Sequence, residues 1–69
     1  MRVAEYLEAR EISYYTFAAE AGIGPETLRR VQLELSMPNG VIIRKIVLAS
    51  RWTPAPCGGT VTADDLLDL

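Results

Sequence analysis

Few side chains in this sequence are of a type that could perform covalent or acid–base chemistry. Its 69 residues include no histidine and one cysteine, Cys57, which lies in a Pro/Gly-rich stretch without a basic neighbour to activate its thiol. The close carboxylate pair Asp64 and Asp65 is explained by the stabilising effect of acids at the start of a helix. No glycine-rich loop could cradle a phosphate. We therefore expect no catalytic activity, no cofactor, no metal site and no small-molecule ligand.

The remaining chemistry is recognition by arginine. Residues 29–51 contain five basic side chains and a single acid, Glu34, whereas acids concentrate near the two ends of the chain. A guanidinium can bond guanine through both O6 and N7, or bind a phosphate. Nucleic-acid-binding domains usually carry a basic excess, and the net charge here is −2. The uneven distribution nevertheless permits one basic face on an acidic body.

Hydrophobic periodicity predicts that helices position these arginines, in one all-α domain that covers residues 1–69. The expected helices span about residues 2–10, 14–21, 25–35, 39–51 and 63–68. No segment approaches the ~18 apolar residues that would cross a bilayer, and the acidic start of the chain does not resemble a signal peptide. A lone cysteine permits no internal disulfide, so we expect a cytoplasmic protein.

Local signals mark the ends of these helices. Ser13 is a good N-cap for the second helix, and Gly22 suits the left-handed residue that follows it. Pro25 suits the first position of the third helix, where its missing N–H costs nothing. Asn39 is a plausible cap for the fourth helix. Thr62 and Asp65 form a variant capping box for the last one.

Apolar spacing also predicts the buried faces. In the first helix Val3, Ala4 and Leu7 share one face, and in the third helix Leu28, Val31 and Leu35 define the buried side. Phe17 and Ala18 fall where the second helix must contact the third. Two short helices that cross steeply around a glycine turn form a helix-turn-helix unit.

At this point the chain resembles the Cro/repressor-type (XRE-like) helix-turn-helix family. Residues 13–23, SYYTFAAEAGI, are similar to the family's opening of Ser, three variable residues, Leu-Ala, three variable residues and Gly-Val. Pro38 lies where the family often has a proline before the fourth helix. Residues 58–66, GGTVTADDL, look like the ending of the YdaS-type, Cro-like branch. The resemblance implies a compact five-helix repressor-like domain that binds double-stranded DNA.

The outward side of the third helix carries Glu26, Arg29, Arg30 and Leu33, with Thr27 at its flank. By resemblance, this face enters the major groove. Arg30 is our first choice for reading a base, and Arg29 could read a base or anchor a phosphate. Glu26 could accept a bond from cytosine, orient Arg30, or form a plain surface ion pair with it. Leu33 could pack on a thymine methyl group.

The start of the second helix, Ser13, Tyr14 and Tyr15, should abut a DNA phosphate by the same resemblance. We expect one of the two tyrosines to pack against the protein, and the sequence does not distinguish them. Asn39 and Arg44 could meet phosphate across the groove, although a simple cap and a solvated charge are equally reasonable interpretations.

The fourth helix is too apolar for a single buried face. Ile43, Ile46 and Val47 suit the core. A second side of the helix holds further apolar residues: Val41, Ile42, Leu48 and Trp52. Apolar surface of this extent usually marks an interface, so we expect a homodimer. The alternative is that Trp52 and the C-terminal leucines cover this side within one chain.

Together these features favour a sequence-specific transcriptional regulator, a phage- or prophage-type repressor that binds a palindromic operator as a homodimer. One alternative is a protein-interaction module, such as an antitoxin-like partner binder. Another keeps DNA binding but assigns an architectural role, or autoregulation of a neighbouring accessory gene of the anti-CRISPR-associated type.

Overall fold

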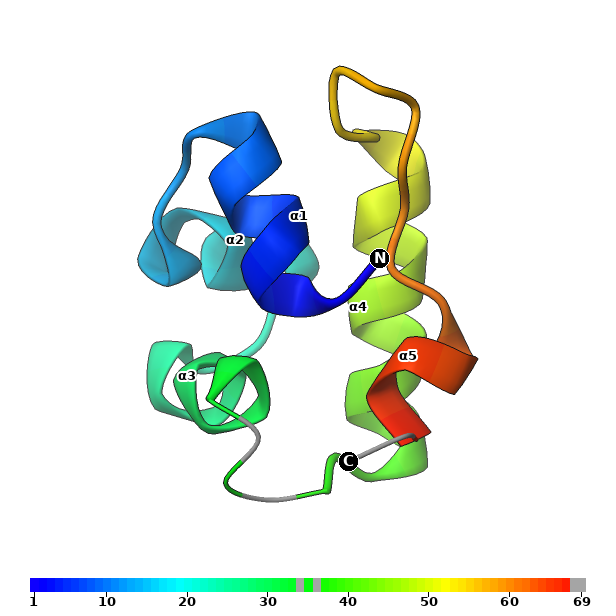
Figure 1. Cartoon of the computed structure of the whole chain (residues 1–69). Helices are drawn as coiled ribbons and strands as arrows, with labels where there is room; N and C mark the ends of the chain where they lie inside the picture. Colours follow the sequence, from blue (N-terminus) through cyan, green and yellow to red (C-terminus); the bar gives the residue numbers. More distant parts are fainter. Residues whose placement is uncertain (34, 36, 68–69) are drawn as a thin grey trace.

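The computed structural model describes residues 1–33, 35 and 37–67. Within them the chain is all-helical, with no strand, as predicted (Figure 1). The helices are α1 (Val3–Arg10), α2 (Tyr14–Ala21), α3 (Pro25–Gln32), α4 (Gly40–Trp52) and α5 (Ala63–Leu67). No helix in the described ranges is both long enough and apolar enough to cross a membrane.

The helices enclose one hydrophobic core. The second helix packs against α3 and α4, α1 packs against α3, and α5 covers one side of α4 (Figure 1). Each helix contributes at least one side chain that is almost completely buried, and the segment before α5 adds another: Tyr6, Phe17, Leu28, Ile46, Val61 and Leu66. The predicted core residues Phe17, Ala18, Leu28 and Val31 are all buried.

The capping predictions are confirmed. The Ser13 side chain accepts a hydrogen bond from the Thr16 N–H, and the Asn39 side chain accepts one from the Ile42 N–H at 2.9 Å. Gly22 ends α2 with φ of 71°, in the left-handed region that favours glycine. Before α5, the Thr62 N–H donates to Asp65 while the Asp65 N–H donates to the Thr62 hydroxyl, which is a reciprocal capping box.

The predicted extent of α3 is wrong at its C-terminal end, which lies at Gln32 and not at residue 35. The Leu35 N–H reaches back to the Arg30 carbonyl at 2.9 Å, as in a helix-terminating turn. Leu35 therefore leaves the face that holds Leu28 and Val31, and it is 71% exposed instead of buried. The expected end of the last helix at residue 68 lies outside the described residues.

The buried face of α1 also differs from the prediction. Ala4 is exposed, and Tyr6 is buried with Val3 and Leu7. The Tyr6 ring contacts Phe17 with centroids 5.0 Å apart, and its hydroxyl donates to the Thr53 carbonyl. Burial of an aromatic ring removes far more apolar surface from water than burial of a methyl group, and the hydroxyl keeps a partner.

An ion pair joins α1 to α2. The Arg10 guanidinium donates to both carboxylate oxygens of Glu20, at 2.8 and 3.3 Å, and also to the Tyr6 hydroxyl at 3.1 Å. The hydrogen bond to Glu20 is the main reason that the pKa of Arg10 is raised. This network fixes α1 against α2.

The segment between α4 and α5 is held by buried polar contacts. The hydroxyl of Ser50, which is fully buried, donates to the Val61 carbonyl and accepts from the Val61 N–H, both at 3.1 Å. Beside this segment the α-amino group of Met1 donates to the Thr60 carbonyl and to Asp65 at 3.0 Å (Figure 1). These contacts join the segment before α5 to α4, and the N-terminus to that segment and to α5.

Candidate nucleic-acid interface

The helices α2 and α3 are joined by a turn of three residues, 22–24. The Ile23 N–H donates to the Ala18 carbonyl at 3.0 Å, and the Lys45 ammonium of α4 donates to the Gly22 carbonyl at 3.3 Å. Ile23 itself packs partly buried against the core. The turn is therefore attached both to α2 and to α4, and it orients α3 relative to the rest of the domain.

The outward face of α3 is where the sequence predicts it. Its five candidate contact residues are all exposed: Glu26, Thr27, Arg29, Arg30 and Leu33. Pro25 occupies the first turn and Gly24 provides no side-chain cap. Glu26 lies in the first turn and the arginines in the last, an arrangement that complements the helix dipole.

The α3 arginines form no ion pair with an acid in the part of the chain that the structure describes. Among the described residues the ion pairs are those of Arg10 with Glu20 and of the α-amino group with Asp65. The proposed pairing of Glu26 with Arg30 is not formed. Both guanidinium groups consequently remain available to an anionic partner.

The structure distinguishes the two tyrosines at the start of α2. Tyr14 is half-buried and packs against the core, whereas Tyr15 is 65% exposed; their rings make an edge contact with centroids 6.5 Å apart. Ser13 is exposed, and its hydroxyl oxygen accepts the capping bond. Tyr15 is therefore the tyrosine that can reach a partner outside the protein.

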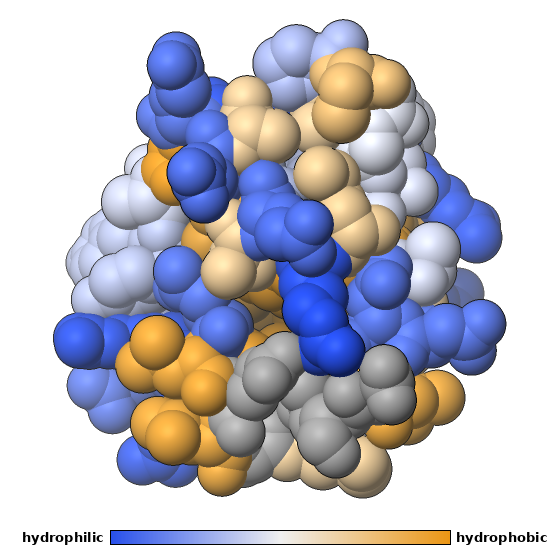
Figure 2. Space-filling model, viewed as in Figure 1, coloured by the Kyte–Doolittle hydropathy of each residue, from blue (hydrophilic) through white to orange (hydrophobic). Residues whose placement is uncertain are grey.

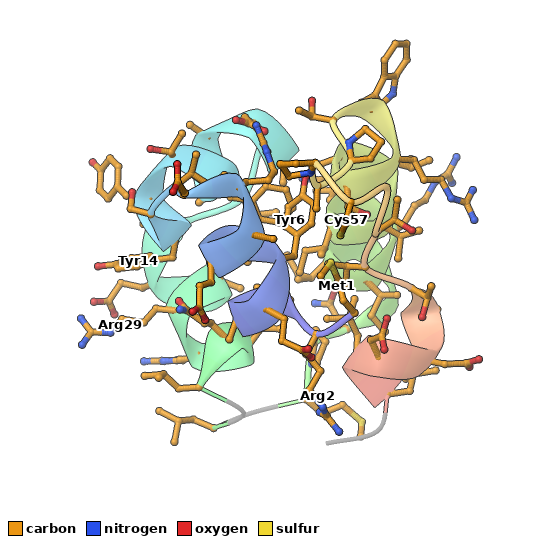
Figure 3. All side chains as sticks on the ribbon, turned by 45° about the horizontal axis from the view of Figure 1, so that its top comes forward. Met1, Arg2, Tyr6, Tyr14, Arg29 and Cys57 are labelled. Carbon is orange, nitrogen blue, oxygen red and sulfur yellow. The ribbon has the colours of Figure 1, made fainter. Side chains whose placement is uncertain are left out.

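A contact between α2 and α3 brings the two candidate clusters together. The Arg29 guanidinium lies over the Tyr14 ring, 5.7 Å from its centroid, and Figure 3 shows both residues on the same side of the molecule. Cation–π contacts form within about this distance. The start of α2 and the outward face of α3 thus form one continuous surface, which we call the α2–α3 face.

Asn39 is not brought into contact with that surface. Its side-chain oxygen caps α4, so the capping interpretation is confirmed, while a phosphate contact by its exposed amide stays a prediction. Arg44 is exposed on α4, as a solvated charge requires.

The predicted dimer face of α4 is largely open. Val41 and Leu48 are exposed, and Trp52 is 86% exposed, whereas Ile42 is half-buried and packs against the core. Ile42 is thus a weaker interface candidate than the other three. In the alternative, Trp52 and the C-terminal leucines cover this side. Val41 and Leu48 stay exposed, so the described residues do not provide that cover, while Leu69 lies outside them.

One apolar surface extends beyond the outward Leu33 that the sequence predicts. Leu33, Leu35 and Met37 are all exposed after the end of α3, and Figure 2 shows hydrophobic surface gathered at this place, at the lower left. Helical periodicity assigned Leu35 to the core because it assumed that α3 continues. A prediction of the helix end at Gln32 would have revealed the patch.

In comparisons with known proteins, no family model matches the chain, and no curated protein or solved structure matches it significantly.

Proposed function

We propose that this protein is a cytoplasmic, sequence-specific DNA-binding regulator in which α2 and α3 act as a helix-turn-helix. The observation that carries the proposal is the exposure of Arg29 and Arg30 on α3 without an acidic partner in the described residues. Such guanidinium groups can bind the phosphates along the edge of a duplex and also the guanine acceptors in its major groove.

In this proposal the outward face of α3 enters the major groove. Arg30 reads a guanine, while Glu26 and Thr27, nearer the start of the helix, contact neighbouring bases. Ser13 and Tyr15 approach the phosphate backbone from the start of α2. Leu33 packs on a thymine methyl group at the far end of the face.

We further propose that the protein binds as a homodimer through α4. Val41, Leu48 and Trp52 recur at spacings of seven and four residues, so they form one apolar stripe along the helix. A two-fold dimer would read a palindromic operator with half-sites one helical turn, ~10 bp, apart. Such binding over a promoter would exclude the polymerase, which is the basis for a repressor role.

The experiment begins with selection of bound duplexes from a random pool, followed by titration of the selected duplex. Arg30→Ala should weaken discrimination at one base pair by about 1–3 kcal/mol, because a bidentate guanine contact is lost. Arg51→Ala is the matched control, since it removes an exposed positive charge from the last turn of α4. Unchanged base preference in Arg30→Ala would exclude this residue as the reader.

A specific observation favours a second candidate, a protein-interaction module. The apolar patch of Leu33, Leu35 and Met37 adjoins the α2–α3 face, and exposed apolar patches commonly contact other proteins. Salt dependence separates the two candidates, because the affinity of a DNA binder falls steeply and log-linearly as salt rises. Absence of binding to any duplex at low salt would favour the protein partner.

A further inference from the structure

The two arginines of α3 differ in their surroundings. The Arg29 guanidinium lies 5.7 Å from the centroid of the Tyr14 ring, whereas Arg30 has neither a ring contact nor an ion pair within the described residues. Consecutive helical residues point about 100° apart, so the two side chains leave α3 in different directions. Both side chains carry the same guanidinium group, but only that of Arg29 is restrained by a ring contact in the described residues.

The Tyr14 ring is itself held in place. It is half-buried against the core, and it also contacts the Tyr15 ring at 6.5 Å. A guanidinium attracted to this ring is drawn toward the start of α2, and Figure 3 shows Arg29 on the same side of the molecule as Tyr14. Tyr14 therefore restricts where the positive charge of Arg29 can lie.

We infer that Tyr14 is a positioning residue that assigns Arg29 to the DNA backbone and leaves Arg30 as the only arginine that reads bases. The inference rests on the proposed function, in which the start of α2 borders the phosphates. A guanidinium over the Tyr14 ring is close to that border, where it neutralises a phosphate of any sequence. Of the two arginines, Arg30 then contributes to base preference and Arg29 to salt dependence.

Titrations of the selected duplex at several salt concentrations test this division. Arg29→Gln should reduce the salt slope by about one phosphate contact and leave the selected bases unchanged. Tyr14→Leu should lower the affinity about two- to fivefold, as expected for loss of an exposed cation–π contact. Tyr14→Phe keeps the ring and should bind like the wild type.

A double-mutant cycle supplies the decisive comparison. In the Arg29→Gln background Tyr14→Leu should have no further effect on affinity, because the two residues act through one contact. Arg30→Gln is the matched comparison, because Arg30 has no ring contact in the described residues, and it should lower the affinity equally in the wild-type and Tyr14→Leu backgrounds. Thermal unfolding of each variant shows that the domain is intact.

Three outcomes would overturn the inference while DNA binding stands: Tyr14→Leu having equal effects in both backgrounds, Tyr14→Phe losing as much affinity as Tyr14→Leu, or Arg29→Gln changing the selected bases. NMR of the free protein tests the contact without DNA. The Arg29 side-chain protons should be shifted upfield by the ring in wild type and Tyr14→Phe but not in Tyr14→Leu. If this shift is present but no duplex binds, the proposed function fails, and the assignment of Arg29 to the DNA backbone fails with it. If the shift is absent, the contact between Arg29 and Tyr14 is refuted.

Discussion

At the scale of single residues, the polar contacts of this domain divide into two groups. Those of Arg10, Ser50 and Asp65 are satisfied by the protein itself. They join α1 to α2, join α4 to the segment before α5, and cap α5. Those of Arg29 and Arg30 are not satisfied by any acid in the described residues. In the proposed function these two guanidinium groups are the ones that meet DNA.

Asp65 gives a prediction on pH. Hydrogen bonds from the Thr62 backbone and side chain, together with the nearby α-amino group, lower the pKa of Asp65 from 3.8 to about 2. Because the folded-state pKa is depressed, the stabilisation is complete above pH 4 and is lost as the pH falls toward 2. It should amount to roughly 1–2 kcal/mol, and Asp65→Asn should lack this part of the pH dependence.

Urea unfolding between pH 2 and 6 measures the difference in free energy of unfolding. Thr62→Ala removes the hydroxyl that donates to Asp65 and should reduce the same pH dependence. Parallel curves for wild type and Asp65→Asn across this range would contradict the assignment.

At the scale of elements, the ends of the helices are set by local chemistry and the faces by packing. The α2–α3 connection illustrates both, since Gly22 supplies the left-handed turn while Phe17, Ala18, Leu28 and Val31 fix the crossing of the two helices. The same contact decides that Tyr14 faces Arg29. The packing that fixes the turn between α2 and α3 therefore also positions the residues of the α2–α3 face.

Gly22→Ala should destabilise the domain by about 1–2 kcal/mol, because an alanine pays the full cost of the left-handed conformation at φ of 71°. A β-carbon at Gly22 meets no atom within 4 Å, so no steric clash adds to this cost. Gly40 also has open space around its β-carbon position but lies in α4. Gly40→Ala should therefore be neutral or stabilise the domain by up to about 1 kcal/mol.

Thermal or urea unfolding of the two alanine variants provides the comparison. Equal stabilities would show that the backbone at Gly22 relaxes to another conformation in solution.

At the scale of the whole molecule, the domain is small and its exposed apolar surface is extensive. A chain of this size buries only about 60% of its unfolded surface, so the proposed association with a second copy would add stability that the core lacks. The stripe of Val41, Leu48 and Trp52 on α4 and the α2–α3 face belong to different helices. A dimer formed through the stripe therefore leaves the arginines of both copies available.

Replacement of two stripe residues tests this arrangement. Leu48→Glu with Trp52→Glu should convert a dimer to a monomer, because charge repulsion replaces an exposed aromatic anchor of the kind that dominates interfaces. Both side chains are exposed, so the fold should survive. Sedimentation equilibrium gives the oligomeric state, with Leu67→Glu as the control, because Leu67 on α5 has an exposure between those of Leu48 and Trp52. A monomeric wild type at high protein concentration would refute the α4 dimer.

The local features of this chain were open to prediction from the sequence. The positions of five helices, the caps at Ser13 and Asn39, the turn at Gly22 and the outward direction of Arg29 and Arg30 all follow from rules that act within one helical turn. Such rules depend on dihedral preferences and on hydrogen bonds between near neighbours, both of which the sequence contains directly.

The tertiary structure alone decided which side chains meet across the fold. It buried Tyr6 in place of Ala4, ended α3 before Leu35, chose Tyr14 over Tyr15 as the packed ring and placed that ring under Arg29. The partners in these cases lie on different helices, or the outcome depends on which competing side chain fills a shared volume. Their pairing follows from the packing of the whole core, which no short stretch of the sequence encodes.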